Sequence, residues 1–297
     1  MLARPGLPRF EYVAARAPDE VIRLLTEHGD AARLMMGGTD LLVRMRDGAF
    51  RPALVIDVKG LPGMRDVAYG ADGLRVGAAV TMNELARHPA VLAHYPLLAE
   101  SANSVASYQL RNRATIGGNL CNASPCADTS PATLIFEGRI VLTGPDGERD
   151  VSAANFFTGP GRTLRQANEI VTAIRFPPPP PSGIGTYLKL GRNKKGDLAL
   201  VSVAVFGYRD ASAPSGVRFR IALGAVAPVV LRVPEAEAIL AADPPGEAAF
   251  ARAADAAMDA ATPINDVRAS AAYRDEMVHN LTLRGLRAVW NTLGKGA

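Results

Sequence analysis

Arg113-Ala-Thr-Ile-Gly-Gly-Asn-Leu-Cys-Asn-Ala-Ser-Pro-Cys-Ala-Asp-Thr-Ser-Pro-Ala132 is the stretch of this 297-residue chain that decides its interpretation. It places the pair Gly117-Gly118 among hydroxyl, amide and carboxyl side chains. A core element would not contain so many small polar residues, and an ordinary surface loop would not interleave Ile116, Leu120 and two cysteines. Paired glycines allow positive φ and a close approach of the backbone to a ligand. Successive N–H groups can then bind an anion.

A second glycine pair lies about eighty residues earlier, in Leu34-Met-Met-Gly-Gly-Thr-Asp-Leu-Leu42. An apolar run predicted to be a buried strand over residues 33–36 precedes it. A helix is expected to begin near Asp40, which could cap it. Alone, Gly37-Gly38 could be no more than a tight strand-to-helix turn that needs positive φ. Together, the two glycine loops indicate one bound dinucleotide with two phosphates to hold.

The rest of the first half predicts a βαβ-like unit followed by antiparallel strands. Residues 18–29 begin with proline, have acids in the first turn and end in glycine, as a helix does. Residues 54–58 form a second apolar strand, and residues 81–84 form a helix capping box. Additional predicted elements are hairpins over 67–77 and 140–151, a helix over 96–105 and a strand over 169–176.

A run of prolines from Pro177 to Pro181 predicts a stiff spacer between two domains. We expect residues 1–177 to form one domain, with subdomains of about 1–60 and 61–177. A linker over 178–185 and a C-terminal domain over 186–297 would follow. The predicted elements of the latter are antiparallel strands over 199–208 and 217–226 and helices over 235–240, 247–260 and 275–293.

Composition excludes several classes of protein. Apolar residues make up 48% and charged residues 21%, as expected for a globular α/β or α+β protein. The net charge of +4 comes from scattered basic residues, so we expect no nucleic-acid partner. No apolar run approaches the roughly 18 residues of a membrane span, and the N-terminus has no signal-like apolar segment. We expect a cytoplasmic protein.

Cys121 and Cys126 are the two cysteines of the sequence. They are too few for an iron–sulfur cluster, which ordinarily takes four protein ligands. A zinc site is also not expected, because the four histidines are dispersed. Two reduced thiols near the loop are the simplest interpretation, and a disulfide between them is an alternative that a cytosolic setting disfavours.

The two loops resemble those of the FAD-binding medium subunits of molybdenum hydroxylases. This family includes carbon monoxide dehydrogenase, 4-hydroxybenzoyl-CoA reductase and xanthine dehydrogenase. The resemblance continues in Phe10-Glu-Tyr12, in Val171-Thr-Ala-Ile-Arg-Phe-Pro177 and in Tyr187-Leu-Lys-Leu190 with Gly196-Asp197. It covers nearly the whole chain. It implies an α+β fold, in which a two-part FAD-binding domain of the vanillyl-alcohol-oxidase (PCMH) type precedes a smaller C-terminal domain of antiparallel sheet and helices.

The resemblance also implies a function and partners. The chain would hold FAD non-covalently and pass electrons from iron–sulfur centres of a partner, through FAD, to an external acceptor. The molybdenum cofactor would belong to a large subunit and two 2Fe–2S clusters to a small subunit. The complex would be a dimer of heterotrimers, that is, a heterohexamer. Substrate contacts would belong to the large subunit, so the sequence names neither the substrate nor the acceptor.

The residues carried over from the family are all expected to bind the cofactor, and none is expected to be catalytic. In the family the first loop cradles the pyrophosphate, and Ile116 could pack on the cofactor. The residues carried over as cofactor-binding are Met36, Gly37, Gly38, Thr39, Asp40, Leu41, Thr115, Ile116, Gly117, Gly118, Asn119, Asp128, Ile174 and Lys189.

Two of these residues carry alternative interpretations. Asp128 could accept hydrogen bonds from ribityl hydroxyls, or it could only close the loop. Lys189 could stabilise the reduced flavin near its N1–C2=O edge, or it could be a solvated surface lysine. Some relatives place an aromatic residue over the flavin ring after Gly196-Asp197, where this chain has Leu198.

Two other classes of function remain open from sequence. One is a self-sufficient FAD-dependent oxidoreductase, although no convincing set of His, Tyr or Cys residues for catalysis is present. The other is a non-redox nucleotide-binding or assembly protein, which would carry no visible flavin.

Overall fold

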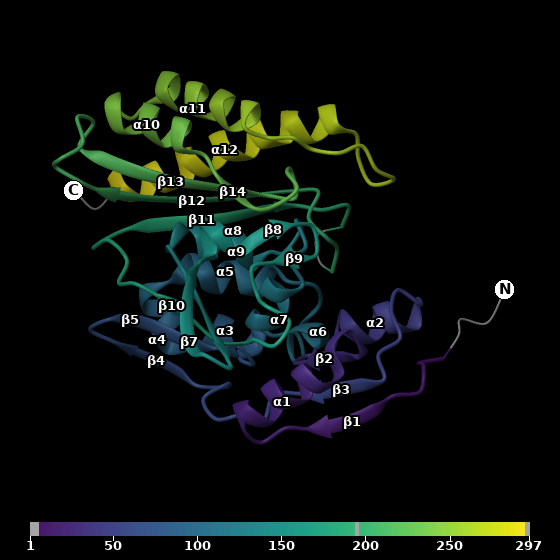
Figure 1. Cartoon of the computed structure of the whole chain (residues 1–297). Coiled ribbons are helices and arrows are strands. Elements are labelled where there is room, and N and C mark those ends of the chain that lie inside the picture. Colours follow the sequence, from purple (N-terminus) through teal and green to yellow (C-terminus); the bar gives the residue numbers. More distant parts are fainter. Residues whose placement is uncertain (1–5, 194–195, 295–297) are drawn as a thin grey trace.

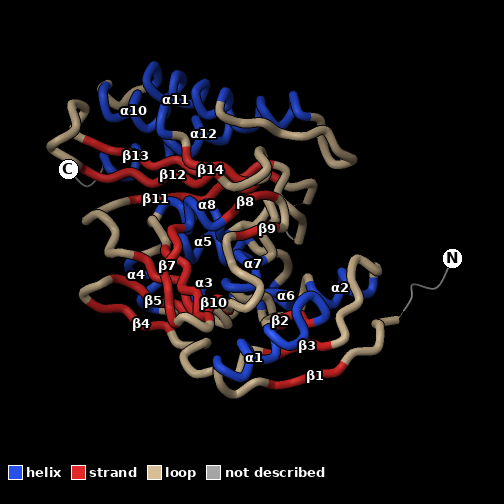
Figure 2. The backbone as a smooth tube through the Cα atoms, in the orientation of Figure 1, coloured by secondary structure: helices blue, strands red, loops and turns tan. Residues whose placement is uncertain are grey.

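The computed structural model describes residues 6–193 and 196–294. Figure 1 and Figure 2 show three tiers, with the N-terminal unit at one end and the C-terminal helices at the other. The strands are β1 (Glu11–Ala14), β2 (Ala32–Met35), β3 (Leu54–Asp57), β4 (Val67–Gly70), β5 (Gly73–Gly77), β6 (Arg139–Gly144), β7 (Gly147–Ser152), β8 (Phe157–Gly159), β9 (Arg162–Thr163), β10 (Ile170–Phe176), β11 (Ile184–Leu190), β12 (Val201–Arg209), β13 (Val217–Gly224) and β14 (Leu231–Arg232). The helices are α1 (Pro18–His28), the 3₁₀ turn η1 (Gly29–Ala31), α2 (Leu41–Arg46), α3 (Met82–Arg87), α4 (Pro89–His94), α5 (Pro96–Ser104), α6 (Tyr108–Arg111), α7 (Ile116–Cys121), α8 (Thr129–Ile135), α9 (Ala153–Phe156), α10 (Pro234–Ala242), α11 (Glu247–Asp259) and α12 (Ala271–Gly294).

The N-terminal unit is the predicted βαβ arrangement. Its three strands form a parallel sheet in the order β1-β3-β2. Helix α1 connects β1 to β2, begins at Pro18 and carries acids in its first turn. It buries Val21, Leu24 and Leu25, which lie on one face of a helix of 3.6 residues per turn. Strand β2 lies at the edge of this sheet, and the loop that follows it lies against the backbone of Arg113 in the middle tier.

The middle tier is built on a five-stranded antiparallel sheet in the order β4-β5-β10-β6-β7. Both predicted hairpins are confirmed, β4–β5 and β6–β7. The capping box is confirmed as well: Thr81 Oγ1 accepts from the Glu84 N–H, and the Glu84 carboxylate accepts from the Thr81 N–H. Helices α3 to α8 lie between this sheet and its neighbours.

The third tier is a four-stranded antiparallel sheet in the order β11-β12-β13-β14. Helices α10, α11 and α12 cover one face, and α5 and α8 lie against the other (Figure 1). The chain is therefore an α+β protein with a C-terminal antiparallel sheet and helices, as predicted. Among the described residues, none of the helices has the length and apolar content required to cross a bilayer.

One core cluster contains side chains from both sides of the predicted linker. One cluster of buried side chains joins Leu98 and Phe136 of the middle tier to Tyr187 and Phe206 of the C-terminal sheet. A second cluster lies between that sheet and its outer helices. The segment between β10 and β11 thus connects two units that share a core, and the boundary at 178–185 remains a prediction.

Candidate cofactor site

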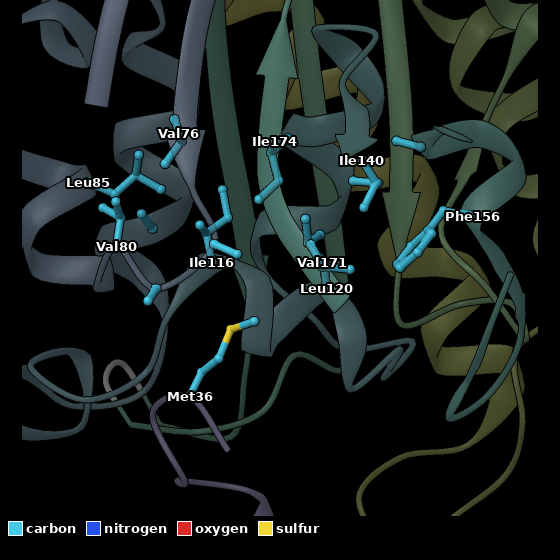
Figure 3. Packing of buried hydrophobic residues seen from close by; sticks show 14 of the residues in the cluster. Met36, Val76, Val80, Leu85, Ile116, Leu120, Ile140, Phe156, Val171 and Ile174 are labelled. Atoms are coloured by element: carbon cyan, nitrogen blue, oxygen red, sulfur yellow. The ribbon is translucent and has the colours of Figure 1, made fainter. Parts of the chain in front are cut away.

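A cavity of about 650 Å³ lies where the N-terminal unit meets the middle tier and the C-terminal sheet. Its lining includes residues 34–41 of the first glycine segment, three residues of α7, residues 124 and 126–128, and residues 196–198. Figure 3 shows Met36 reaching from the N-terminal unit toward Ile116 and Leu120 of α7 and Val171 of β10. The cavity thus lies beside a core cluster to which both the N-terminal unit and the middle tier contribute side chains, Met36 among them. Its volume is in the usual range for ligand sites.

The first glycine pair forms a loop between β2 and α2. Gly38 has φ of +75°, a conformation that glycine adopts without strain. A Cβ on Gly37 would lie 2.1 Å from the carbonyl oxygen of Arg113, so the loop backs directly onto the second glycine segment. Within the described residues, the backbone N–H groups of Gly37 to Leu41 donate no hydrogen bond to the protein, and the first bond of α2 runs from Leu42 N to Gly38 O. Consecutive free N–H groups at a cavity are an anion-binding arrangement.

The second glycine pair is not a loop but part of the short helix α7. Thr115 caps this helix by accepting from Gly118 N (3.1 Å), and Gly118 does not have positive φ. The other N–H groups are also used, since Ile116 N donates to Val80 O, Gly117 N to Ala78 O and Asn119 N to Thr115 O. The prediction of a second N–H concavity is therefore wrong. This segment instead lines the cavity with side chains and with the backbone of Gly118.

The glycines of α7 are needed for packing. A Cβ on Gly117 would lie 2.6 Å from the Ala78 side chain and 2.7 Å from its carbonyl oxygen. A Cβ on Gly118 would lie 2.9 Å from Thr115 Oγ1, the capping hydroxyl. Both positions therefore exclude larger side chains for reasons of space.

Asp40 joins the two glycine segments instead of capping α2. It occupies the N-cap position, but its side chain makes no capping bond; Asn122 Nδ2 donates to its Oδ1 at 3.2 Å. Burial raises the pKa of Asp40, and the nearby Arg44 and the Thr39 hydroxyl oppose this shift. The predicted capping role is wrong, because a short contact across the cavity replaces it.

Asp128 lies at the cavity with two buried partners from β11. Tyr187 OH donates to Oδ1 at 2.7 Å, and Lys189 Nζ donates to Oδ2 at 2.9 Å and to Ser104 O at 3.1 Å. Burial raises the pKa of Asp128, while the Lys189 ammonium and the two hydrogen bonds act to lower it. Lys189 is therefore not a solvated surface lysine: its side chain is 15% exposed.

Ten of the fourteen predicted residues line the cavity and four do not. Ile116 and Gly117 face the core, because α7 packs against the loop at Ala78–Val80. Ile174 is fully buried in β10 between β5 and β6 and is not among the lining residues, whereas Val171 of the same strand lines the cavity. Lys189 reaches the cavity only through Asp128. The ten are Met36, Gly37, Gly38, Thr39, Asp40, Leu41, Thr115, Gly118, Asn119 and Asp128.

Other lining residues were not predicted. Leu198 is 57% exposed and leaves one part of the cavity without an aromatic cover, and Arg33, Arg44 and Phe50 line another part. No spacing in the sequence marks these last three, because they lie on a strand, on a helix and after that helix. The sequence also predicts a basic loop over residues 192–195, and of these, residues 194–195 lie outside the described part of the chain.

Both cysteines line the cavity as free thiols. Burial raises the pKa of the Cys121 thiol to about 11. The described part of the chain contains no group of three or more His, Cys, Asp or Glu side chains placed to hold a metal ion.

Comparison with known proteins agrees with this architecture. The family described as "FAD binding domain in molybdopterin dehydrogenase" matches residues 8–179, and the "CO dehydrogenase flavoprotein C-terminal domain" matches residues 186–289. The carbon monoxide dehydrogenase medium chain of Hydrogenophaga pseudoflava is 36% identical over 283 residues, which are 95% of this chain and 98% of that protein. The xanthine dehydrogenase FAD-binding subunit of Escherichia coli O157:H7 is 30% identical over 91% of this chain and 92% of its own length.

Solved structures extend the comparison. A carbon monoxide dehydrogenase chain from Hydrogenophaga pseudoflava superposes with a TM-score of 0.91 and 36% identity, covering 96% of this chain and 98% of that chain. Quinoline 2-oxidoreductase from Pseudomonas putida 86 gives a TM-score of 0.90 with 27% identity, over 97% of this chain and 99% of that chain. The chain therefore belongs to the FAD-binding medium subunits of the molybdopterin dehydrogenases, of the carbon monoxide dehydrogenase and xanthine dehydrogenase type.

Proposed function

We propose that this chain holds one non-covalent FAD and passes electrons from iron–sulfur centres of a partner subunit, through that FAD, to an external acceptor. Bound flavin supplies one- and two-electron redox chemistry, and the protein supplies placement and electrostatics. The observation that carries the proposal is the run of free N–H groups from Gly37 to Leu41 at a cavity of about 650 Å³.

The residues present fit a flavin dinucleotide. The free N–H groups are suited to a pyrophosphate, since an anion can accept several converging donors at once. The packing of Gly37 on Arg113 leaves no room for a side chain at the turn. The cavity lining includes residues of the N-terminal unit (Arg33, Phe50), of the middle tier (Asp128) and of the segment after β11 (Leu198).

Asp128 and its partners are proposed to position the flavin half of the cofactor. An ionised Asp128 can accept hydrogen bonds from ribityl hydroxyls, and Tyr187 and Lys189 hold it in place. The Lys189 charge would then act on the cofactor through Asp128. The described residues that line the cavity include no histidine, and the two cysteines among them are free thiols.

We propose that electrons enter from another protein, since the two cysteines of the sequence are too few to hold an iron–sulfur cluster here. By analogy with relatives named as subunits of carbon monoxide and xanthine dehydrogenases, we propose a small subunit with 2Fe–2S clusters and a large subunit with the molybdenum cofactor. A dimer of heterotrimers is the proposed assembly.

Flavin content tests the cofactor part of the proposal. The purified chain should contain one flavin, and acid precipitation should release it as FAD into the supernatant. Flavin that stays on the pellet would contradict non-covalent binding, and FMN in the supernatant would contradict a dinucleotide site. Affinity purification from the native host should recover molybdenum and iron with the chain, and their absence would contradict the proposed partners.

A further inference from the structure

A second pocket, of about 280 Å³, lies beside the segment that leads into α7. Asn112 of this segment lines it, while Leu110, Ala114 and Thr115 of the same segment line the cofactor cavity. Two residues of chain span at most about 7 Å, so the Cα of Asn112 lies within that distance of the cavity wall at Ala114. The residues that line this second pocket, which we call the basic pocket, are Arg65, Thr81, Asn83, Glu84, Arg87 and Asn112.

Glu84 contributes the carboxylate of the basic pocket, and both of its oxygens are already bonded. Arg65 Nη2 pairs with Oε1, and the N–H and the hydroxyl of Thr81 each donate to Oε2 at 2.8 Å. Asn112 Oδ1 accepts from Asn83 Nδ2 at 2.6 Å, whereas Asn112 Nδ2 has no acceptor within the described chain. The carboxylate of the basic pocket is thus occupied, while a donor still faces no partner.

Arg87 adds a positive charge that forms no salt bridge with a described carboxylate. Its guanidinium carbon lies 5.1 Å from the centre of the Tyr108 ring, and its Nη1 donates to Tyr108 OH at 3.4 Å. Arg111 lies within electrostatic reach, since burial and then the Arg87 charge lower the pKa of its guanidinium. Arg111 is held by Asn83 Oδ1, which accepts from its Nε at 3.1 Å, and by two backbone carbonyls. Guanidinium groups held beside a pocket in this way favour a carboxylate or phosphate ligand.

The surroundings of the basic pocket favour a protein surface over a free anion. Tyr108 and Leu110 of α6 are 46% and 45% exposed, and α6 contacts α3, the helix that carries Arg87. Exposed tyrosine and arginine side chains are enriched at protein interfaces, where arginine and carboxylate pairs fix the orientation of the partners. A free phosphate would use the arginines but would leave Tyr108 and Leu110 in water.

We propose that this face, formed by the basic pocket with Tyr108 and Leu110, docks an acidic surface of the electron-donating partner subunit. The inference rests on the proposed function, which requires such a partner. A carboxylate of the partner pairs with Arg87 and accepts from Asn112 Nδ2, and its neighbours pack on Tyr108 and Leu110. The segment from Leu110 to Thr115 then lies between the partner and the cofactor cavity. Opposite charges also steer the partner onto this face, so association depends on salt.

The test measures association of the flavin-loaded chain with the cluster-bearing subunit purified from the native complex. Biolayer interferometry at low and at high salt gives the association and dissociation rates for the wild type, Arg87→Glu and Arg87→Lys. Arg284→Glu is the matched control, because Arg284 is an exposed arginine of α12 that lines neither pocket and its reversal changes the net charge equally. The flavin content of each variant confirms that the cofactor site is intact.

We expect Arg87→Glu to slow association about tenfold at low salt, and the difference from the wild type should shrink at high salt. Arg87→Lys keeps the charge and Arg284→Glu lies elsewhere, so both should stay within about threefold of the wild type. Flavin content should be the same in all variants.

Association of Arg87→Glu at the wild-type rate, or an equal loss in Arg284→Glu, would overturn the inference. Inorganic phosphate that binds the wild type but not Arg87→Glu, with partner association unchanged, would assign the basic pocket to a free anion and overturn it as well. A flavin-loaded wild type that binds no cluster-bearing subunit at either salt concentration would instead contradict the proposed function itself.

Discussion

Replacing Gly37 by alanine tests whether the first glycine loop must lie against the Arg113 backbone. The added Cβ would lie 2.1 Å from the Arg113 carbonyl oxygen, whereas ordinary contact begins near 3.4 Å, so something must move by about 1.3 Å. The atoms that this Cβ would meet are backbone atoms of Arg113 and Ala114, so no flexible side chain can relieve the clash. Overpacking of this kind costs about 1–3 kcal/mol of folding free energy.

The same displacement should affect cofactor binding more strongly than stability. Hydrogen bonds weaken steeply beyond about 3.2 Å between donor and acceptor. A shift of about 1.3 Å would therefore break several of the hydrogen bonds that the N–H groups of Gly37–Leu41 are proposed to donate to the pyrophosphate. We expect FAD affinity to fall about a hundredfold, or about 2.8 kcal/mol. Quenching of flavin fluorescence during titration of apoprotein measures this, and urea unfolding measures stability.

Gly60→Ala is the matched control for this prediction. Gly60 lies outside the cavity, has no positive φ and would place its Cβ 3.7 Å from the nearest atom, Ala15 O. It should bind FAD like the wild type. If Gly37→Ala also bound FAD within twofold of the wild type, the loop would not hold the cofactor through its backbone.

Gly118→Val should abolish FAD binding, because its Cβ would lie 2.9 Å from Thr115 Oγ1 and its side chain would project into the cavity. The core cluster between the C-terminal sheet and its helices should stay folded, and flavin retained after gel filtration would refute the prediction. Lys189→Met should destabilise the protein by about 3 kcal/mol, because it leaves the buried Asp128 carboxylate without its ion pair. Burial already raises the pKa of Asp128, and removing the ammonium raises it further, so the loss of stability should become smaller as the pH falls through the raised pKa; a loss that does not change with pH in urea unfolding would contradict this. Cys121, whose thiol has a pKa of about 11, should be thiolate in only about one molecule per thousand at pH 8 and should alkylate slowly in the native protein, which peptide mass spectrometry after iodoacetamide would check.

Local signals predicted much of the fold. Pro18, the acids after it and Gly29 mark the two ends of α1, and the Thr81–Glu84 capping box marks the start of α3. These signals work because each depends on residues that are close in sequence. The paired glycines likewise located the cavity, since both the turn at Gly38 and the close packing of Gly37 require a small residue.

Long-range contacts explain what the sequence could not predict. The α7 N–H groups are used because Ala78 and Val80 present carbonyl oxygens to Gly117 and Ile116. The pairing of Lys189 with Asp128 joins residues 61 positions apart. The sequence could not predict which side of β10 meets the cavity, because alternate residues of a strand face opposite sides and the apolar pattern of β10 does not distinguish them.

The central claim, that this chain relays electrons received from a partner, is tested most directly by substrate-driven reduction of its flavin. The chain is mixed with its cluster-bearing and molybdenum-bearing partner subunits without oxygen, and flavin absorbance near about 450 nm is followed after substrate is added. We predict full bleaching in the three-subunit mixture and none with the chain alone or without the cluster-bearing subunit. Full bleaching of the isolated chain by substrate would contradict the account and indicate a self-sufficient flavin oxidoreductase.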